Sequence, residues 1–389
     1  MTEWIDQKLS EFMDFNPYTP LTKGSIAKKV SMECLTPFNR KIQGYEETVF
    51  FGGSKFKNGD TLLARITPCL ENGKTAYVDF LNDEEVAFGS TEFIVLRSKE
   101  GISDSKFIYY FSISDDFRDT AIQLMSGTTG RQRVETEALK QKVFTLPPLP
   151  EQKAIAEVLS SLDDKIDLLT RQNKTLEDLA QAYFRKWFIE DASDEWEVGK
   201  LGDFVEVIDN RGKTPPYQDI PTEYPIIEVK SISGDNRFID YQKCEKFVLE
   251  STYKTWFRGY IKPLDVLVST VGSVGEIAQV LLEHGVIAQN VIGLRSKGTS
   301  PYHLFEYMKY MKNEIKELDI GSVQPSIKVP HLLSLQYVKP DRDSLRKFDD
   351  FSKELVNKMI SNFMQIQTLQ KLRDTLLPKL ISGEIRVKM

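Results

Sequence analysis

The longest uninterrupted pattern in the sequence runs from Pro147 to Trp187. It begins P-P-L-P-E-Q-K-A-I-A and contains no glycine and no further proline after Pro150. A run of about forty residues without a helix-breaking residue predicts one long helix. Because such a helix is too long for a small domain to surround, the rest of the chain has to be organised around it.

Apolar residues recur along this helix in steps of four and three, which is the pattern of a coiled-coil seam. The seam is Ile155, Leu159, Leu162, Ile166, Leu169, Asn173, Leu176, Ala180, Tyr183 and Trp187, with Asn173 its only polar member. A second seam lies near the C-terminus and consists of Phe348, Leu355, Met359, Asn362, Ile366, Leu369, Leu376 and Leu380. We therefore expect two long helices that pair with each other.

The order of the chain predicts that this pair is antiparallel. Placing Asn173 opposite Asn362 avoids a buried amide facing leucine, and it defines every other layer. The layers are Leu169 with Ile366, Ile166 with Leu369, Leu159 with Leu376, Leu176 with Met359, Ala180 with Leu355, Trp187 with Phe348 and Ile155 with Leu380. Two layers are poor, Leu162 with Arg373 and Tyr183 with Ser352. Pro378 is expected to end or kink the second helix.

The chain is also duplicated. Glu3-Trp4, Lys8-Leu9 and Phe12 recur at the same spacing almost two hundred residues later as Glu195-Trp196, Lys200-Leu201 and Phe204. Further matches are 59–66 with 264–271, 93–99 with 291–297, 126–134 with 320–329 and 179–188 with 372–381. Each half therefore consists of a globular part followed by a long helix.

Short runs rich in Val, Ile, Phe and Tyr, separated by turn residues, predict several strands in each globular part. Helices are expected near 106–125 and 302–318, with Ser105 and Ser300 as N-caps. The predicted fold class is α+β, with two mixed α/β domains in pseudo-twofold repeat joined by an antiparallel pair of helices. The predicted boundaries are 1–146 and 191–340 for the domains, and 147–190 and 341–389 for the helices.

Composition excludes several classes of protein. The chain has 389 residues and a net charge of −6, so it does not bind nucleic acid through overall charge. Its start lacks an apolar signal region, and no stretch approaches about twenty apolar residues, so we expect a cytoplasmic protein without a membrane partner. Three separated cysteines and three scattered histidines predict neither disulfides nor a zinc site.

Catalytic motifs are sparse. We find no phosphate-binding loop, no nucleophile elbow and no H-E-x-x-H pair, and the sequence predicts no cofactor. The nearest approach to a catalytic site is Asp219 with Glu228 and Lys230 on a predicted strand, which could hold magnesium and orient a water molecule. A half-solvated strand has the same pattern, and the first half has no counterpart. The non-catalytic interpretation is therefore favoured.

Polar and basic residues instead gather on turns at matching places in the two halves. Arginine, glutamine and asparagine can pair with base edges, whereas serine, threonine and lysine commonly contact phosphate. Any one of these residue types is more often an ordinary turn residue than a DNA contact, but the matched set favours DNA contact. The candidates are Arg65, Lys74, Ser90, Thr91, Thr128, Arg131, Gln132, Arg133, Arg211, Lys213, Ser269, Thr270, Ser273, Gln289, Asn290, Gln324, Ser326 and Lys328.

Two motifs connect the chain to a known family. F-T-L-P-P-L-P-E-Q-K-A-I-A-E-V-L-S-S-L-D-D-K-I-D (Phe144 to Asp167) and T-L-L-P-K-L-I-S-G-E-I-R-V (Thr375 to Val387) resemble the specificity subunit of type I restriction-modification systems. The resemblance covers the full length. One departure is that Tyr337 to Phe348 reads Y-V-K-P-D-R-D-S-L-R-K-F, without the P-L-P-E-Q run.

The resemblance implies recognition without catalysis. Each of two domains would read half of a split site in double-stranded DNA, while the two helices space the domains and dock two methyltransferase subunits. Those subunits would modify adenine, and motor-nuclease subunits would cut unmodified DNA. Two alternatives remain open: a self-sufficient magnesium-dependent nuclease that uses Asp219, Glu228 and Lys230, and a repeat-built interaction scaffold without a DNA role.

Overall fold

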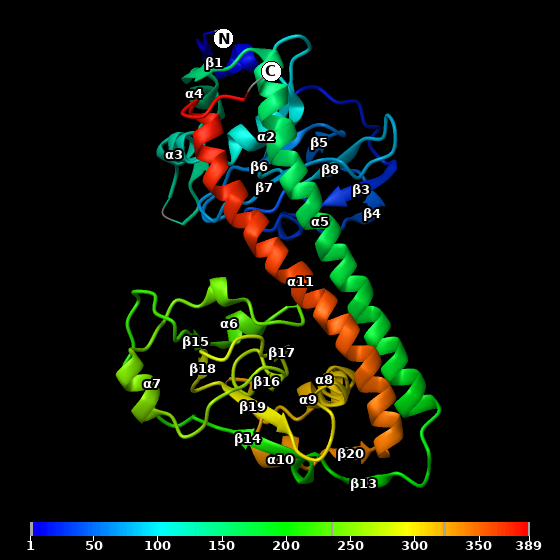
Figure 1. The fold of residues 1–389 in the computed structure, drawn as a ribbon. Helices are drawn as coiled ribbons and strands as arrows, with labels where there is room; N and C mark the ends of the chain where they lie inside the picture. The colour runs from blue at the N-terminus through cyan, green and yellow to red at the C-terminus, as the bar shows by residue number, and fades with distance from the viewer. Residues whose placement is uncertain (1–2, 129, 235, 322–323, 388–389) are drawn as a thin grey trace. The chain divides into compact units, whose positions relative to one another are not determined.

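The computed structural model describes residues 3–128, 130–234, 236–321 and 324–387. The chain divides into two compact units (Figure 1). The first unit comprises Met1–Thr170 with Met364–Met389, and the second comprises Arg171–Phe363. Two long helices, α5 (Leu149–Arg185) and α11 (Arg342–Ile381), contribute residues to both units. In the described part of the chain, no helix is both long and apolar enough to cross a membrane.

The first unit is built on two four-stranded sheets. One is antiparallel in the order β2-β9-β6-β7, and the other has the order β4-β3-β8-β5 with β3 and β8 parallel. The strands are β1 (Ile5–Lys8), β2 (Met13–Phe15), β3 (Ile26–Val30), β4 (Glu46–Val49), β5 (Ser54–Phe56), β6 (Thr61–Ala64), β7 (Thr75–Tyr77), β8 (Ala87–Gly89), β9 (Phe93–Ser98), β10 (Met125–Ser126), β11 (Arg133–Val134) and β12 (Val143–Leu146). β1 pairs with β12, and β10 with β11. The helices are α1 (Leu9–Phe12), α2 (Ser105–Ser112), α3 (Asp115–Gln123) and α4 (Thr136–Lys140), with a 3-10 turn at Met32–Cys34.

The second unit repeats this plan with fewer strands. Its antiparallel sheet has the order β14-β19-β16-β17, the counterpart of β2-β9-β6-β7, and the parallel pair β15-β18 matches β3-β8. The strands are β13 (Glu197–Lys200), β14 (Val205–Ile208), β15 (Ile226–Ile227), β16 (Val266–Ser269), β17 (Ile277–Gln279), β18 (Val286–Ile287), β19 (Val291–Ser296) and β20 (Gln336–Lys339). β13 pairs with β20. The helices are α6 (Val229–Ile232), α7 (Glu250–Trp256), α8 (Pro301–Tyr310), α9 (Lys312–Glu317) and α10 (Val329–Leu333), with 3-10 turns at Leu201–Asp203 and Tyr241–Lys243.

Matched ion pairs confirm the duplication at the level of side chains. Arg97 in β9 binds the buried Asp60 through two bonds of 2.7 Å, and Arg295 in β19 binds the buried Asp265 through bonds of 3.0 and 2.7 Å. Each aspartate directly precedes the central strand of its sheet, β6 or β16, all of whose side chains are buried. A bidentate bond to arginine allows a carboxylate to enter such a core.

The helical segments predicted after these sheets are present but interrupted. Near 106–125 the chain forms α2 and α3, and near 302–318 it forms α8 and α9. Ser300 caps α8 as predicted, because its hydroxyl accepts bonds of 3.1 Å from the backbone of Tyr302 and His303. The prediction for Ser105 is wrong. Asp104 caps α2 instead, and the Ser105 hydroxyl lies 3.0 Å from that of Tyr77.

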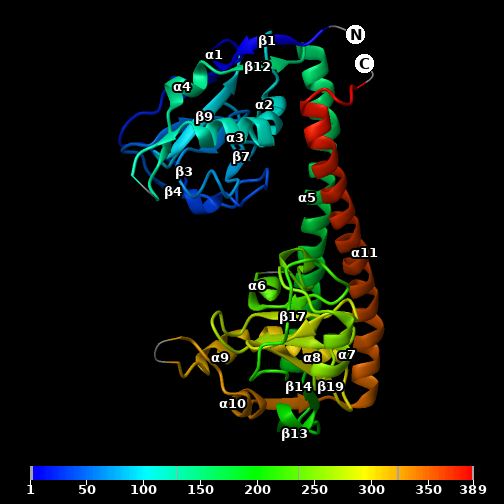
Figure 2. The same cartoon turned by 90° about the vertical axis from the view of Figure 1, so that its left-hand side faces the viewer.

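The predicted antiparallel register is confirmed where the second unit contains it. Asn362, fully buried, donates from Nδ2 to Oδ1 of Asn173 over 2.9 Å, and the rings of Trp187 and Phe348 lie 6.0 Å apart. Trp187 belongs to a π-helical turn, Lys186–Glu190, that follows α5. Figure 2 shows the two helices side by side.

Both poor layers have visible consequences. In the first unit Arg373 donates to Asp163, the neighbour of Leu162, over 2.8 Å. In the second unit the buried Ser352 hydroxyl has no hydrogen-bond partner among the described residues, and the ring centroids of Tyr183 and Phe351 lie 4.3 Å apart. Of the two outcomes predicted for Pro378, an end of the helix is wrong, because α11 continues to Ile381; a kink stays a prediction. Ile155 and Leu380 lie in one buried cluster.

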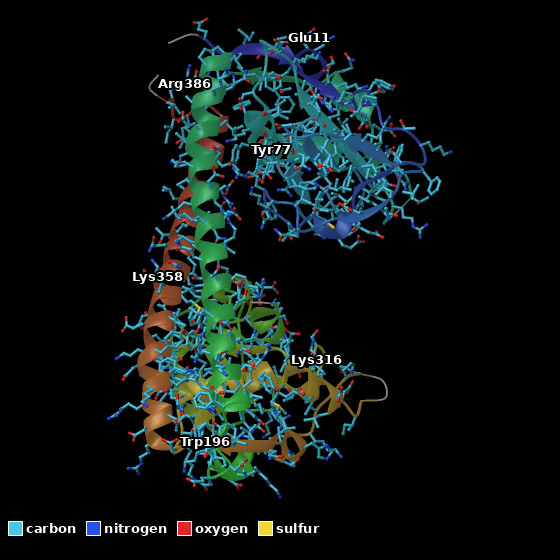
Figure 3. All side chains as sticks on the ribbon, turned by 90° about the vertical axis from the view of Figure 1, so that its right-hand side faces the viewer. Glu11, Tyr77, Trp196, Lys316, Lys358 and Arg386 are labelled. Atoms are coloured by element: carbon cyan, nitrogen blue, oxygen red, sulfur yellow. The ribbon has the colours of Figure 1, made fainter. Side chains whose placement is uncertain are left out.

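The P-L-P-E-Q run makes contacts within the first unit. Glu151, which is buried, accepts bonds from Trp4 over 3.1 Å and from Arg386 over 2.6 Å; Arg386 is labelled in Figure 3. Gln152 bonds the backbone of Asp104 over 2.9 Å. In the second half Asp341 accepts the indole N–H of Trp196 over 2.9 Å. The second half lacks the P-L-P-E-Q run, but its tryptophan still donates to an acid, with Asp341 in the place of Glu151.

Candidate nucleic-acid interface

Three turns of the first unit meet at one junction. The N–H of Arg65, after β6, donates to the carbonyl of Glu92, before β9, over 2.9 Å. The Arg65 carbonyl accepts from Val134 in β11 over 2.9 Å, and Thr67 donates to Gln132 over 3.0 Å. These bonds join all three loops in which the sequence places candidate residues, and they hold the loops with backbone geometry.

The second unit forms the same junction. Thr270, after β16, donates to the carbonyl of Asn290 over 2.7 Å and accepts from Ile327 over 2.8 Å. Gly272 donates to Pro325 over 3.0 Å. Each bond has its counterpart in the first unit, although the residues differ. The structure thus brings together the turns whose matching was predicted from sequence.

Several candidates in the first unit already have protein partners. Glu92 accepts three bonds from Arg133, the shortest 2.7 Å, and lies 3.5 Å from Arg65. The Arg133 guanidinium lowers the pKa of Glu92, so this carboxylate stays ionised. Lys74 donates to the Met32 carbonyl over 2.9 Å, and the Ser90 hydroxyl accepts from the Glu92 N–H over 3.1 Å. These side chains shape the junction.

The second unit shows a similar division. Arg211 makes a bidentate bond to Asp209, 2.8 and 3.0 Å, which lowers the pKa of that aspartate, and its Nη1 donates to the Thr270 hydroxyl over 3.3 Å. Ser269 and Thr270 are fully buried; the Ser269 hydroxyl donates to the Ser273 carbonyl of its own turn, and the Thr270 hydroxyl to the Asn290 carbonyl of the neighbouring turn. Arg211 is half-buried, and Ser269 and Thr270 do not face solvent. They support the loops that do.

The remaining candidates present their side chains at the surface or at its edge. In the first unit Thr91, Thr128 and Arg131 are exposed and Gln132 is half-buried. In the second unit Lys213, Ser273, Gln289, Asn290, Gln324 and Lys328 are exposed, and Ser326 is half-buried. The Gln289 amide donates to the Thr214 hydroxyl over 2.8 Å. This mixture of basic, amide and hydroxyl groups on firmly held turns suits contact with base edges and phosphates.

Sequence reasoning missed the acids of the junction. Glu92 binds Arg133 and Asp209 binds Arg211, whereas the sequence prediction named only residues that could contact DNA. Their signal was available, because Glu92 directly follows the Ser90-Thr91 turn and Asp209 lies two residues before Arg211.

The nuclease candidates do not form the predicted arrangement. The strand prediction is wrong, because Glu228 is the N-cap of the short helix α6. Glu228 pairs with Lys246 over 2.7 Å, and Lys230 with Glu245 over 2.5 Å. Asp219 is exposed. Among the residues that the structure describes, no three His, Cys, Asp or Glu side chains gather where a metal ion could bind.

Comparison with known proteins agrees with this picture. The family model of the type I restriction modification DNA specificity domain matches residues 1–178 and 193–336. A specificity subunit of the type I restriction enzyme MjaIX of Methanocaldococcus jannaschii is 27% identical over 75% of this chain and 71% of its own length. The HindI specificity subunit of Haemophilus influenzae is 20% identical over 99% of this chain and 100% of its own.

A solved structure shares the fold. The S subunit of a type I restriction-modification system from M. genitalium has a TM-score of 0.56, with 19% sequence identity over 99% of this chain and 96% of that one. The chain belongs to the family of type I restriction-modification DNA specificity proteins. Its function is recognition of DNA sequence within such a system, together with methyltransferase and restriction subunits, and it is not itself catalytic.

Proposed function

We propose that each unit reads one half of a bipartite DNA target. Residues 1–146 would read one half-site and residues 191–340 the other, while 147–190 and 341–389 act as spacer helices. The observation that carries this proposal is the junction of three turns, which is built twice with the same backbone bonds and different side chains. Equal scaffolds with unequal side chains are suited to reading two different short sequences.

Exposed candidate side chains are assigned to DNA contact, and those bonded within the protein are assigned to holding the loops. In the first unit, Arg131 and Gln132 would meet base edges, with Thr91 and Thr128 at the phosphates. In the second, Gln289, Asn290 and Gln324 would meet base edges, with Lys213, Ser273, Ser326 and Lys328 at the phosphates. Arg65, Lys74, Ser90, Arg133, Arg211, Ser269 and Thr270 would hold the loops.

The charge of the chain bears on its partners. With a net charge of −6 it can supply only part of the phosphate neutralisation that duplex binding needs. Two methyltransferase subunits would complete those contacts and supply the adenine chemistry, and motor-nuclease subunits would carry out cleavage. No cofactor is proposed for this chain.

Mapping methylated adenines tests the proposal. The chain and its methyltransferase partner are produced together in a host that lacks other adenine methylation, and modified sites are sequenced. We expect a motif of two short specified segments separated by unspecified bases, with no methylation when the chain is left out. A contiguous motif would contradict the bipartite proposal. Magnesium-dependent cleavage by the purified chain, lost in Glu228→Ala, would instead support the nuclease alternative.

A further inference from the structure

Each unit contains a buried arginine at the same place in its fold. The carbonyl of Arg40 accepts from the N–H of Tyr77, at the end of β7, over 2.9 Å. The carbonyl of Arg237 accepts from Gln279, at the end of the matching strand β17, over 2.7 Å. The two side chains are only 6% and 3% exposed. Each of the two units therefore contains a buried arginine at the equivalent position.

Both guanidinium groups bind acids of the same helix, α5. In the first unit Arg40 forms an ion pair with Asp164. In the second unit Arg237 donates from Nη1 to Glu177 over 3.0 Å. Each bond joins the globular part of a unit to the stretch of α5 that belongs to that unit.

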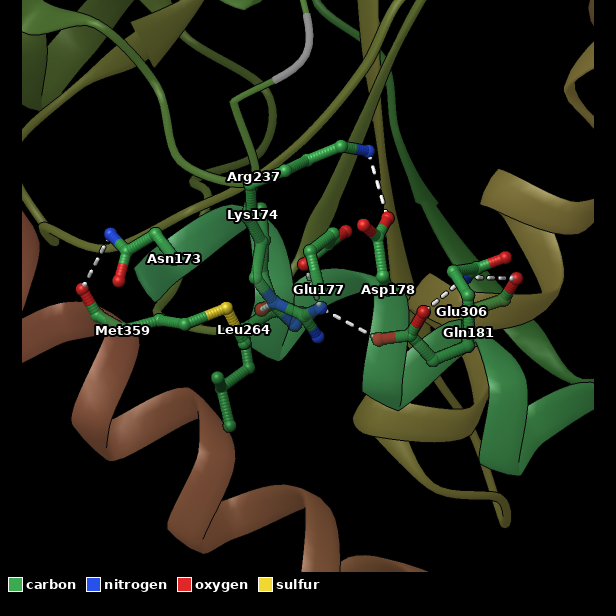
Figure 4. A network of polar contacts seen from close by, with 10 residues as sticks. Asn173, Lys174, Glu177, Asp178, Gln181, Arg237, Leu264, Glu306 and Met359 are labelled. Carbon is green, nitrogen blue, oxygen red and sulfur yellow. Dashed lines mark hydrogen bonds and ion pairs between the residues drawn. The ribbon is translucent and has the colours of Figure 1, made fainter. Parts of the chain in front are cut away.

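The arrangement in the second unit is the more extensive (Figure 4). Arg237 also donates to Glu306 of α8 over 2.6 Å and to Gln279 over 2.9 Å. Its guanidinium lies 3.9 Å from the centre of the Phe305 ring. From α5, Gln181 donates to the Glu306 carbonyl over 3.3 Å and also to its carboxylate. Glu177 and Gln181 are one helical turn apart, so α5 presents both from one face.

A buried ionic cluster adds little net stability, because desolvation offsets its attraction. Its geometry is nevertheless specific, since charge-assisted hydrogen bonds are directional. The surrounding contact is apolar: Phe238 of the globular part packs with Val356 and Met359 of α11. Apolar contacts are non-directional and tolerate small rotations. The ionic cluster is therefore the part of this contact that fixes the orientation of the globular part relative to α5.

We propose that Arg237 with Glu177 and Gln181, and Arg40 with Asp164, are positioning residues that restrict the spacer length of the DNA target. They hold the reading surface of each unit at one orientation on its helix segment. A change of one base pair in the spacer rotates and shifts a half-site, so a firmly oriented unit rejects it. This inference rests on the proposed bipartite function.

The test uses the double variant Glu177→Ala with Gln181→Ala in the complete methyltransferase complex. It removes the three bonds that Glu177 and Gln181 of α5 make to the cluster but leaves Arg237 paired with Glu306 inside the globular part. Methylation rates are measured on duplexes whose spacer is native, one base pair shorter or one longer. We expect the preference for the native spacer to fall roughly tenfold, the size of one lost base contact, while base preference within each half-site stays unchanged.

Three further variants sharpen the outcome. Asp178→Ala is the matched control, because it removes an exposed carboxylate of the same turn that pairs with Lys174 over 2.8 Å. Glu177→Gln retains an acceptor for Arg237 and should keep native selection. Should the double variant fail to fold, Asp164→Ala makes the same test in the first unit, where the aspartate is 58% exposed.

The possible failures are distinguishable. If the wild-type complex has no spaced motif, the bipartite function itself is wrong. If the wild type selects its spacer and the folded double variant selects it equally well, the positioning role is wrong. A parallel loss of spacer and base preference would also overturn the proposal, because it would indicate general loosening of the unit.

Discussion

At the scale of single residues, Glu92 gives the arginines of the first unit different surroundings. Its carboxylate is held by Arg133 and lies beside Arg65, whereas Arg131 is exposed on the same loop. Two arginines that look equivalent in the sequence therefore have different surroundings. We propose that Arg131 contacts a base and that Arg133 holds the loop.

This difference predicts different binding defects. Arg131→Ala should relax one base position of one half-site by about 1–3 kcal/mol and leave the other half-site unaffected. Arg133→Ala should weaken binding to all sequences, because it removes the three hydrogen bonds that neutralise the Glu92 carboxylate and leaves only the longer contact with Arg65, 3.5 Å. Competition binding with singly substituted duplexes measures both effects. If Arg131→Ala weakens every duplex equally, its guanidinium contacts only phosphate.

His303 predicts a pH dependence of the second unit. Its ring is buried, lies 2.7 Å from the Tyr337 hydroxyl, and has a pKa that burial lowers to about 3. In the unfolded chain the ring titrates near pH ~6.5, so below that pH the unfolded state binds more protons. Stability should therefore be complete above pH ~6.5 and fall toward pH ~3 by up to about 1.4 kcal/mol per pH unit.

Urea unfolding of the wild type and of His303→Gln at pH 7.5, 6.5 and 5.5 isolates this contribution. The variant is less stable at pH 7.5 but should lose less stability on acidification. Parallel pH profiles for the two proteins would show that His303 does not carry the effect.

At the scale of elements, the asparagine pair decides how α5 and α11 align. Asn362 donates to Asn173, and Asn173 donates to the Met359 carbonyl over 3.3 Å. This register pairs the two amides, although Oδ1 of Asn362 accepts no hydrogen bond from the residues that the structure describes. The layer of Leu162 and Arg373 accommodates its polar member through the Arg373 bond to Asp163.

A double-mutant cycle measures this pair. Asn362→Leu alone should cost about 1–3 kcal/mol of unfolding free energy, because it leaves the half-buried Asn173 amide with one bond fewer. Adding Asn173→Leu should recover most of that loss while weakening the selection of register. Urea unfolding of the wild type, both single variants and the double variant provides the coupling energy. Additive single effects would show that the amides do not act as a pair.

At the scale of the whole molecule, the helices predict the spacing of the target. One heptad is inserted between Leu169 and Asn173 in α5, and another between Asn362 and Ile366 in α11. Each insertion of seven residues lengthens its helix by roughly 10 Å. This should lengthen the unread spacer by about three base pairs, at about 3.4 Å each. Methylation mapping of the extended variant measures the spacing. An active variant that keeps the old spacing would show that the helices are not the ruler.

Two features of this molecule follow from the sequence alone: its duplication and the register of its helices. The repeated Trp4 and Trp196 segments, the heptad seams and the two asparagines carry this information locally, through spacing and residue type. Few registers of two helices place apolar residues opposite apolar residues and also pair the two asparagines. The register can therefore be predicted without coordinates.

Only the tertiary structure decided which polar side chains are available and which are engaged. Arg133 and Arg131 differ because Glu92 contacts only Arg133 of the two, from the turn before β9, and α2 is capped by Asp104 instead of Ser105. The ties of Arg40 and Arg237 to α5 join residues more than fifty positions apart. A through-space partner leaves no fixed spacing in the chain, so its choice depends on how the folded segments meet.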